Sequence, residues 1–84
     1  MGSYQREIMG AGDAESVTPA NSNLPLVATY GATKGLLVSS AGTANLMMES
    51  GNIVTGMPLQ VGYNPLRVKQ VRTGGTASGI YALY

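Results

Sequence analysis

Few residues in this chain could take part in catalysis or hold a metal ion. The 84-residue sequence has no histidine and no cysteine, and only four carboxylates. Glu7, Asp13 and Glu15 lie close together near the N-terminus, whereas Glu49 stands alone at an expected hairpin. Acid–base and metal catalysis need clustered titratable groups, and without thiols or imidazoles a metal would have oxygen ligands only. We therefore expect no enzyme activity, no catalytic residues, no cofactor and no metal site.

A basic segment near the C-terminus is the second feature with chemical potential. Arg67 and Lys69 fall on the same face of an expected strand, and Arg72 follows them. A basic strip on a small β-barrel can bind single-stranded nucleic acid when aromatic rings alternate with the charges. The tyrosines mostly lie elsewhere, and the net charge is only +1, which gives little phosphate-driven affinity. We favour an exposed face or ion pairs to a partner, and we keep single-stranded nucleic-acid binding as an alternative.

The composition indicates a chain that gains stability from copies of itself. Charged residues make up 11% of the sequence, against about 25% in an average domain. A chain this short buries a small core, and the lack of cysteine excludes disulfides as cross-links. We therefore expect a homo-oligomer. No apolar run approaches the roughly 18 residues of a membrane helix, so a membrane is not an expected partner.

The chain divides near residue 33. Residues 1–33 have no sustained hydrophobic period and contain Pro19 and Pro25, which stop a helix from continuing. We expect an extended N-terminal arm lying along neighbouring molecules, with at most a short helix over residues 4–9. Residues 34–84 alternate short apolar runs with turn residues, which predicts an all-β fold: a small antiparallel β-sandwich or barrel.

The expected strands cover residues 35–40, 44–49, 52–55, 59–63, 66–73 and 77–84. Residues 56–58 are expected to break the chain direction, and residues 74–76 to form a hairpin turn. In the longest strand Leu66 and Val68 share a face, but Val71 is out of phase by one residue. A β-bulge near residues 69–70 would restore the inward pattern.

The last strand is apolar on both faces. Ile80, Ala82 and Tyr84 occupy one face, and Tyr81 and Leu83 the other. A strand of this kind is covered on both sides, either by a second subunit or by a central place in a two-sheet sandwich. The candidate interface with another copy or with a shell consists of apolar residues from the last two strands: Leu66, Val68, Val71, Ile80, Tyr81, Leu83 and Tyr84.

Much of the sequence resembles one known family. The segments that carry the resemblance are Leu24-Pro25, residues 35–46, Met57-Pro58-Leu59 and residues 65–84. They are similar to the head spike base proteins of gene transfer agents and related tailed phages. In that family the ending is a basic strand, a Thr/Gly turn and an apolar strand that finishes in Ala-Leu-Tyr. Residues 1–23 do not take part in this resemblance.

The resemblance implies a virion structural protein. Its members are small β-sandwiches that oligomerise on the capsid exterior, as decoration, cement or spike base subunits, and can anchor a fibre. The implied partners are other copies of the chain, the major capsid protein and a spike fibre protein, and the implied location is the virion surface after synthesis in the host cytoplasm. Residues 44–56 carry less charge than the corresponding family segment, which leaves the fibre open. A tail or baseplate component is the alternative within the same class.

Overall fold

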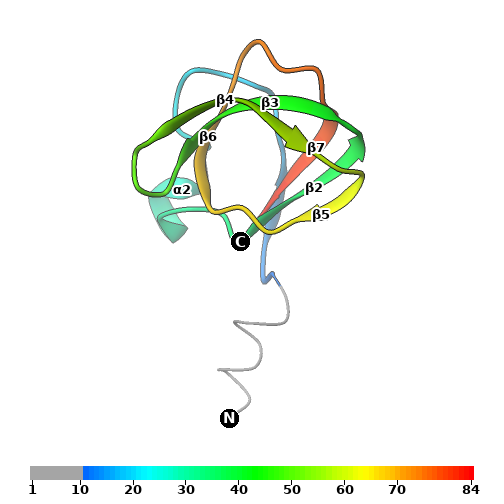
Figure 1. The fold of residues 1–84 in the computed structure, drawn as a ribbon. Helices are drawn as coiled ribbons and strands as arrows, with labels where there is room; N and C mark the ends of the chain where they lie inside the picture. Colours follow the sequence, from blue (N-terminus) through cyan, green and yellow to red (C-terminus); the bar gives the residue numbers. More distant parts are fainter. Residues whose placement is uncertain (1–10) are drawn as a thin grey trace.

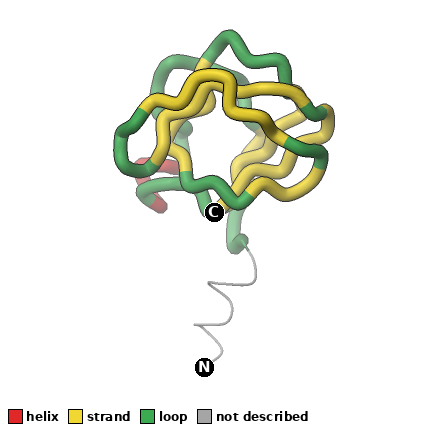
Figure 2. Tube along the Cα trace, viewed as in Figure 1, coloured by secondary structure: helices red, strands yellow, loops and turns green. Residues whose placement is uncertain are grey.

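The computed structural model describes residues 11–84, and this part of the chain is almost entirely β (Figures 1 and 2). Its elements are β1 (Ala14–Ser16), α2 (Val27–Tyr30), β2 (Gly35–Ser40), β3 (Gly42–Met48), β4 (Ile53–Leu59), β5 (Gly62–Asn64), β6 (Val68–Arg72) and β7 (Ser78–Leu83). All observed strand pairs are antiparallel. A four-stranded sheet has the order β1-β7-β2-β5, and a three-stranded sheet has the order β4-β3-β6. The predicted all-β fold with packed antiparallel sheets is therefore confirmed.

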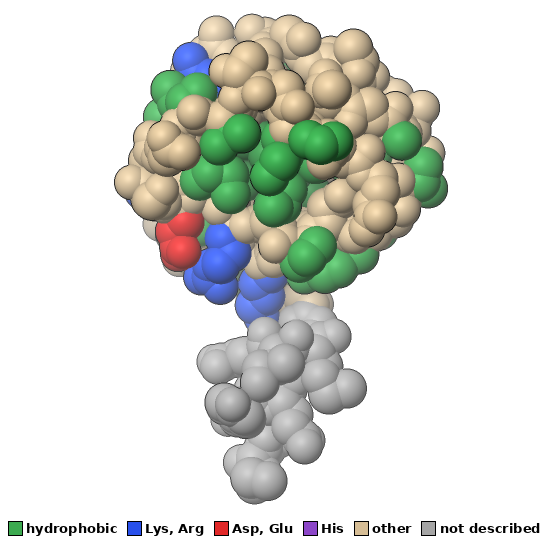
Figure 3. Space-filling model, viewed as in Figure 1, with side chains coloured by type: hydrophobic (Ala, Val, Ile, Leu, Met, Phe, Trp, Pro, Cys, Tyr) green, Lys and Arg blue, Asp and Glu red, His purple; other side chains and the backbone are tan. Residues whose placement is uncertain are grey.

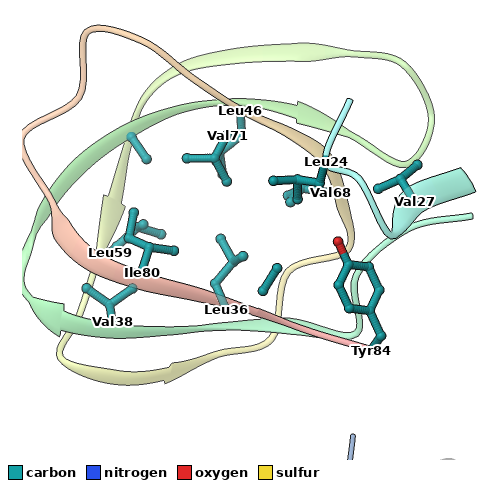
Figure 4. Close-up of a cluster of buried hydrophobic side chains, with 12 residues drawn as sticks. Leu24, Val27, Leu36, Val38, Leu46, Leu59, Val68, Val71, Ile80 and Tyr84 are labelled. Carbon is teal, nitrogen blue, oxygen red and sulfur yellow. The ribbon is translucent and has the colours of Figure 1, made fainter. Parts of the chain in front are cut away.

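The hydrophobic core fills the space between the two sheets (Figure 4). Strand residues alternate between two faces, so every second side chain of a strand can point inward. The four-stranded sheet contributes Leu36, Val38, Ile80 and Ala82, and the three-stranded sheet contributes Ala44, Leu46, Leu59, Val68 and Val71. The opening that the ribbon of Figure 1 suggests is thus occupied by side chains.

A β-bulge keeps the two valines of β6 in the core. Met47 of β3 pairs with Gln70, and the next residue along β3 pairs with Val68. Lys69 is therefore an extra residue, which shifts the alternation by one. Both Val68 and Val71 are almost completely buried as a result. The bulge predicted near residues 69–70 is confirmed.

The predicted break at residues 56–58 is wrong, because β4 continues through it to Leu59. The pairing of β3 with β4 shifts register opposite Asn45, and this second bulge accommodates the extra residue of β4. Gly56 has a φ of 72°, which glycine adopts without steric strain, and its N–H donates to Asn45 Oδ1 at 2.9 Å. Pro58 is tolerated because β4 is an edge strand of its sheet.

The predicted strand at residues 59–63 and the predicted hairpin turn at residues 74–76 are also wrong, because the chain passes from one sheet to the other at both places. Residues 59–63 do not form one strand: β4 ends, the chain turns at Gln60, and β5 begins in the other sheet. The Asn64 side chain fixes this corner by accepting from the Gln60 N–H at 3.0 Å and donating to its carbonyl at 2.9 Å. Residues 74–76 likewise connect β6 to β7 across the two sheets, so they are not a hairpin turn.

The described part of the predicted arm folds against its own chain. β1 pairs with β7, and two backbone N–H groups, of Ala20 and Leu24, donate to carbonyls of β6. Leu24 and Val27 then enter the core, each with 6% of its surface exposed. The polar residues of this segment are accommodated because their backbone groups pair with a strand edge. The expected helix over residues 4–9 lies outside the described residues.

Thr33 shows that the predicted domain boundary between residues 33 and 34 is wrong. Its side chain is fully buried, and Oγ1 donates to the Leu66 carbonyl at 2.8 Å. The same oxygen accepts from the Val68 N–H at 2.9 Å, while the Thr33 N–H donates to the Val68 carbonyl at 3.0 Å. One threonine therefore pairs three backbone groups of the β5–β6 segment, and the folded unit includes residues on both sides of the boundary.

Candidate interaction surface on the four-stranded sheet

The carboxylates of residues 11–84 have structural hydrogen-bond partners. Asp13 accepts from the Tyr30 hydroxyl at 3.0 Å, and Glu15 accepts from the Tyr84 hydroxyl at 2.6 Å. Within these residues no group of three or more acidic, histidine or cysteine side chains is placed to hold a metal ion. No helix in the same part of the chain has the length and apolarity to cross a bilayer.

Four of the predicted interface residues are buried in the core of the chain itself. Val68, Val71, Ile80 and Tyr84 each expose 4% of their surface or less. These side chains face the core of the chain itself, so the structure does not place them on the exterior as an interface requires. Leu66 is partly buried and packs against the same core. The prediction failed because apolar residues in a strand have the same appearance whether they face a core or a partner.

Tyr81 and Leu83, the other two predicted residues, lie on the outer face of the four-stranded sheet. Tyr81 is 46% exposed, and Leu83 is partly buried. In the sheet register Leu37 is opposite Tyr81 on one side and opposite Tyr63 on the other. Leu37 and Tyr63 are 44% and 51% exposed. Tyr81, Leu37 and Tyr63 thus form an exposed row across three adjacent strands, which we call the apolar row.

The ring of Tyr63 is held flat against the sheet. A Cβ atom on Gly35 would lie 2.7 Å from Cζ of Tyr63, so the ring occupies the space that a side chain would take. The Tyr63 hydroxyl donates to the Lys34 carbonyl at 3.3 Å. Glycine on a strand exposes backbone, and an aromatic ring on the neighbouring strand can cover it. Sequence analysis missed Leu37 and Tyr63 because their adjacency depends on which strands pair.

The outer face around the apolar row has no charged side chain among the residues that the structure describes. Strand alternation and register place nine residues on it: Ala14, Ser16, Gly35, Leu37, Ser39, Tyr63, Gly79, Tyr81 and Leu83. Figure 3, which views the molecule from the direction of Figure 1, shows acidic and basic side chains side by side at the lower left and a further basic side chain at the upper left. By its residues, the face is uncharged and partly aromatic, which is typical of a contact surface.

The predicted basic face does not form one continuous strip. Arg67 binds Glu49 through two nitrogens, with Nε–Oε1 at 3.1 Å and Nη2–Oε2 at 3.2 Å. This exposed pair lowers the pKa of Glu49, chiefly through the hydrogen bond to Arg67, and Lys69 lowers it further by charge attraction. Arg72 Nη1 instead donates to Gln70 Oε1 within β6. The arginines therefore serve local contacts at opposite ends of the strand.

An open hollow of about 470 Å³ lies beside Arg67. Its lining includes Lys34 and the rings of Tyr30 and Tyr84, which stack with centroids 5.1 Å apart. The hydroxyls of both rings bind carboxylates, as described above, so two negative charges lie close to the two cations. The hollow thus has no strong excess of positive charge.

Comparisons with known proteins add no relative. No family model matches the chain, and neither a curated protein nor a solved structure matches it.

Proposed function

We propose that this chain is a virion structural protein: a subunit that decorates or cements the capsid exterior, or forms the base of a head spike. It works as a repeated copy, in contact with other copies and with the major capsid protein. A spike fibre protein is a further partner. The observation that carries the proposal is the outer face of the four-stranded sheet, whose described residues are uncharged and partly aromatic.

Three properties support this role over a catalytic one. The described carboxylates are engaged in structural hydrogen bonds. The described chain folds into one small unit. Its edge strand β6 is covered by residues 20–24, so the molecule offers a face and not an open edge there. The resemblance of residues 65–84 to head spike base proteins adds a class of assembly in which a small sandwich is repeated many times.

Particle fractionation tests the proposal. Particles are purified by density gradient from the culture that produces this chain, and an antibody against the purified chain is used on each fraction. We expect the chain to sediment with intact particles in many copies per particle, and immunogold label to lie on the heads. Label confined to tails would favour the tail or baseplate alternative. Recovery of the chain only from the soluble fraction would contradict the whole proposal.

Single-stranded nucleic-acid binding is the alternative from another class. The hollow beside Arg67 offers the exposed ring of Tyr30 next to two cations, which is the kind of site that stacks a base. The adjacent Asp13 and Glu15 carboxylates and the Glu49 pair of Arg67 would repel phosphates. Filter binding of oligonucleotides over a range of salt concentrations tests it. We expect no retention at low salt, and binding that weakens steeply with added salt would favour this alternative.

A further inference from the structure

Resting on the assembly role proposed above, we propose that the apolar row is a self-association surface that packs against the same row of a second copy. The two-fold axis runs along β2 at Leu37. In this arrangement Leu37 meets Leu37 of the second copy, and Tyr81 of each copy faces Tyr63 of the other.

The register of the sheet gives the row the symmetry that such a pair requires. Leu37 is on the central strand, with a tyrosine opposite it on each neighbouring strand. A two-fold rotation about the direction of β2 exchanges the two neighbouring strands, so aromatic positions coincide with aromatic positions. Closed two-fold contacts use one self-complementary patch on both partners. The apolar row is self-complementary in this sense, because Leu37 lies between two tyrosines and the rotation places each tyrosine opposite a tyrosine.

The absence of charge on the outer face favours a second copy over other partners. A nucleic acid or an anionic membrane is recognised by cations, and the described residues of this face include none. An uncharged surface pairs best with another uncharged surface, because a charged group placed on it would lose its solvation without a counter-charge. The same face of a second copy meets this requirement and brings no like charges together.

The row is also fixed in place before any contact is made. Leu37 belongs to a strand that is paired on both sides, and the Tyr63 ring is held over Gly35. Tyrosine offers a large contact area with few rotatable bonds, so little conformational entropy is lost when it is covered.

The size of the face predicts a weak pair. The strands β1, β7, β2 and β5 have 3, 6, 6 and 3 residues. At about 3.3 Å per residue and about 4.8 Å between strands, they outline roughly 300 Å² per copy. The pair would bury roughly 600 Å² in total, about half of the smallest area of a stable complex. Such a contact exchanges rapidly in solution. It becomes effective when many copies are held side by side on a shell, where the local concentration is high.

Sedimentation equilibrium of the purified chain, from about 20 μM to about 1 mM, tests the proposal together with NMR at the same concentrations. We expect the average mass to rise toward that of a dimer, and the amide signals of Leu37, Tyr63 and Tyr81 to shift. Leu37→Lys places two like charges at the axis and should weaken association at least about tenfold. Ile53→Lys is the matched control, because Ile53 is 50% exposed on β4 of the other sheet, and it should associate like the wild type.

Mixing two variants tests the axis itself. Leu37→Lys and Leu37→Glu should each remain monomeric alone, and an equimolar mixture should associate, because the axis brings opposite charges together. Monomeric wild type at about 1 mM, or equal association of Leu37→Lys and wild type, would overturn the inference. If the wild type is monomeric but sediments with particles, self-association fails while the virion role stands. If it forms the pair but is absent from particles, the virion role fails instead.

Discussion

The aromatic ring of Tyr63 occupies the space above the Cα atom of Gly35, on the neighbouring strand of the four-stranded sheet. Gly35 is buried only because this ring covers it, and the ring is in turn held to the sheet by its hydroxyl at the Lys34 carbonyl. The two residues are diagonal neighbours, since Tyr63 pairs with Leu37. One residue without a side chain therefore determines the shape of the candidate contact face.

Gly35→Ala should displace the Tyr63 ring and destabilise the protein. The added Cβ would lie within 3 Å of ring atoms, and over-packing of this kind costs about 1–3 kcal/mol. Urea unfolding measures the loss, and the NMR signals of the Tyr63 ring report its displacement. Gly12→Ala is the control, because nothing lies within 4 Å of the added atom and φ there is not positive. Equal stability of the wild type and Gly35→Ala would refute this account of the pair.

Thr33→Val should destabilise the protein more than its change of shape suggests. Valine has nearly the same volume but leaves the Leu66 carbonyl and the Val68 N–H without their partner. Each buried backbone group that loses its hydrogen bond costs about 1–3 kcal/mol, so a total of about 2–6 kcal/mol is expected in urea unfolding. Thr29→Val, at an exposed position of α2, should change the free energy of unfolding by less than about 0.5 kcal/mol. A loss at Thr33 no larger than at Thr29 would contradict the assigned hydrogen bonds.

Local patterns in the sequence were sufficient to separate the two faces of the last strand, but not to tell which one faces the core. Ile80, Ala82 and Tyr84 share the buried face, and Tyr81 is exposed on the other. The strand at residues 35–40 was also predicted with its observed bounds. These features depend only on neighbours along the chain, and the physics of alternation is the same in any sheet.

The pairing of distant strands could not be predicted in this way. Glu15 lies opposite Ala82, and nothing in either local sequence indicates the other. The position of β5 and β7 in one sheet, and of β4 and β6 in the other, likewise depends on how the sheets close around the core. The apolar row was missed for this reason. The short apolar run Leu24-Pro25-Leu26-Val27 was a usable signal that the supposed arm enters the core.

Deletion of Lys69 should remove the bulge of β6 without reversing its inward pattern. Lys69 is the extra residue, so in a chain without it Val68 and Val71 lie two positions apart and share a face by ordinary alternation. The deletion also removes the carbonyl that accepts from the Leu24 N–H, and a buried group without its partner costs about 1–3 kcal/mol. Urea unfolding measures the loss. Lys69→Ala keeps that carbonyl and is the control, and it should retain most of the stability. A loss far above this range in the deletion variant would show that the two valines need the bulge to stay buried.

The hydrogen bond between Tyr84 and Glu15 should make the protein less stable at alkaline pH. Burial first, and then the bond to the Glu15 carboxylate, raise the pKa of the Tyr84 hydroxyl above its ordinary value. The unfolded chain therefore loses this proton near pH 10 while the folded chain keeps it. Stability from this source is present below about pH 10 and is lost as the pH rises through the folded pKa.

Tyr84→Phe should separate the contribution of the hydrogen bond from the contribution of the tyrosine ionisation. Near neutral pH the variant loses a hydrogen bond to a charged group, which costs about 1.5–3 kcal/mol. Above about pH 10 its free energy of unfolding should fall less steeply with pH than that of the wild type, because one ionisation is removed. Urea unfolding at a series of pH values measures both slopes, and absorbance titration of the tyrosines checks the order of ionisation. Tyr81→Phe, on the exposed face, is the matched control. Parallel slopes for the wild type and Tyr84→Phe would mean that Tyr84 ionises equally in the folded and unfolded chains, contrary to the contact with Glu15.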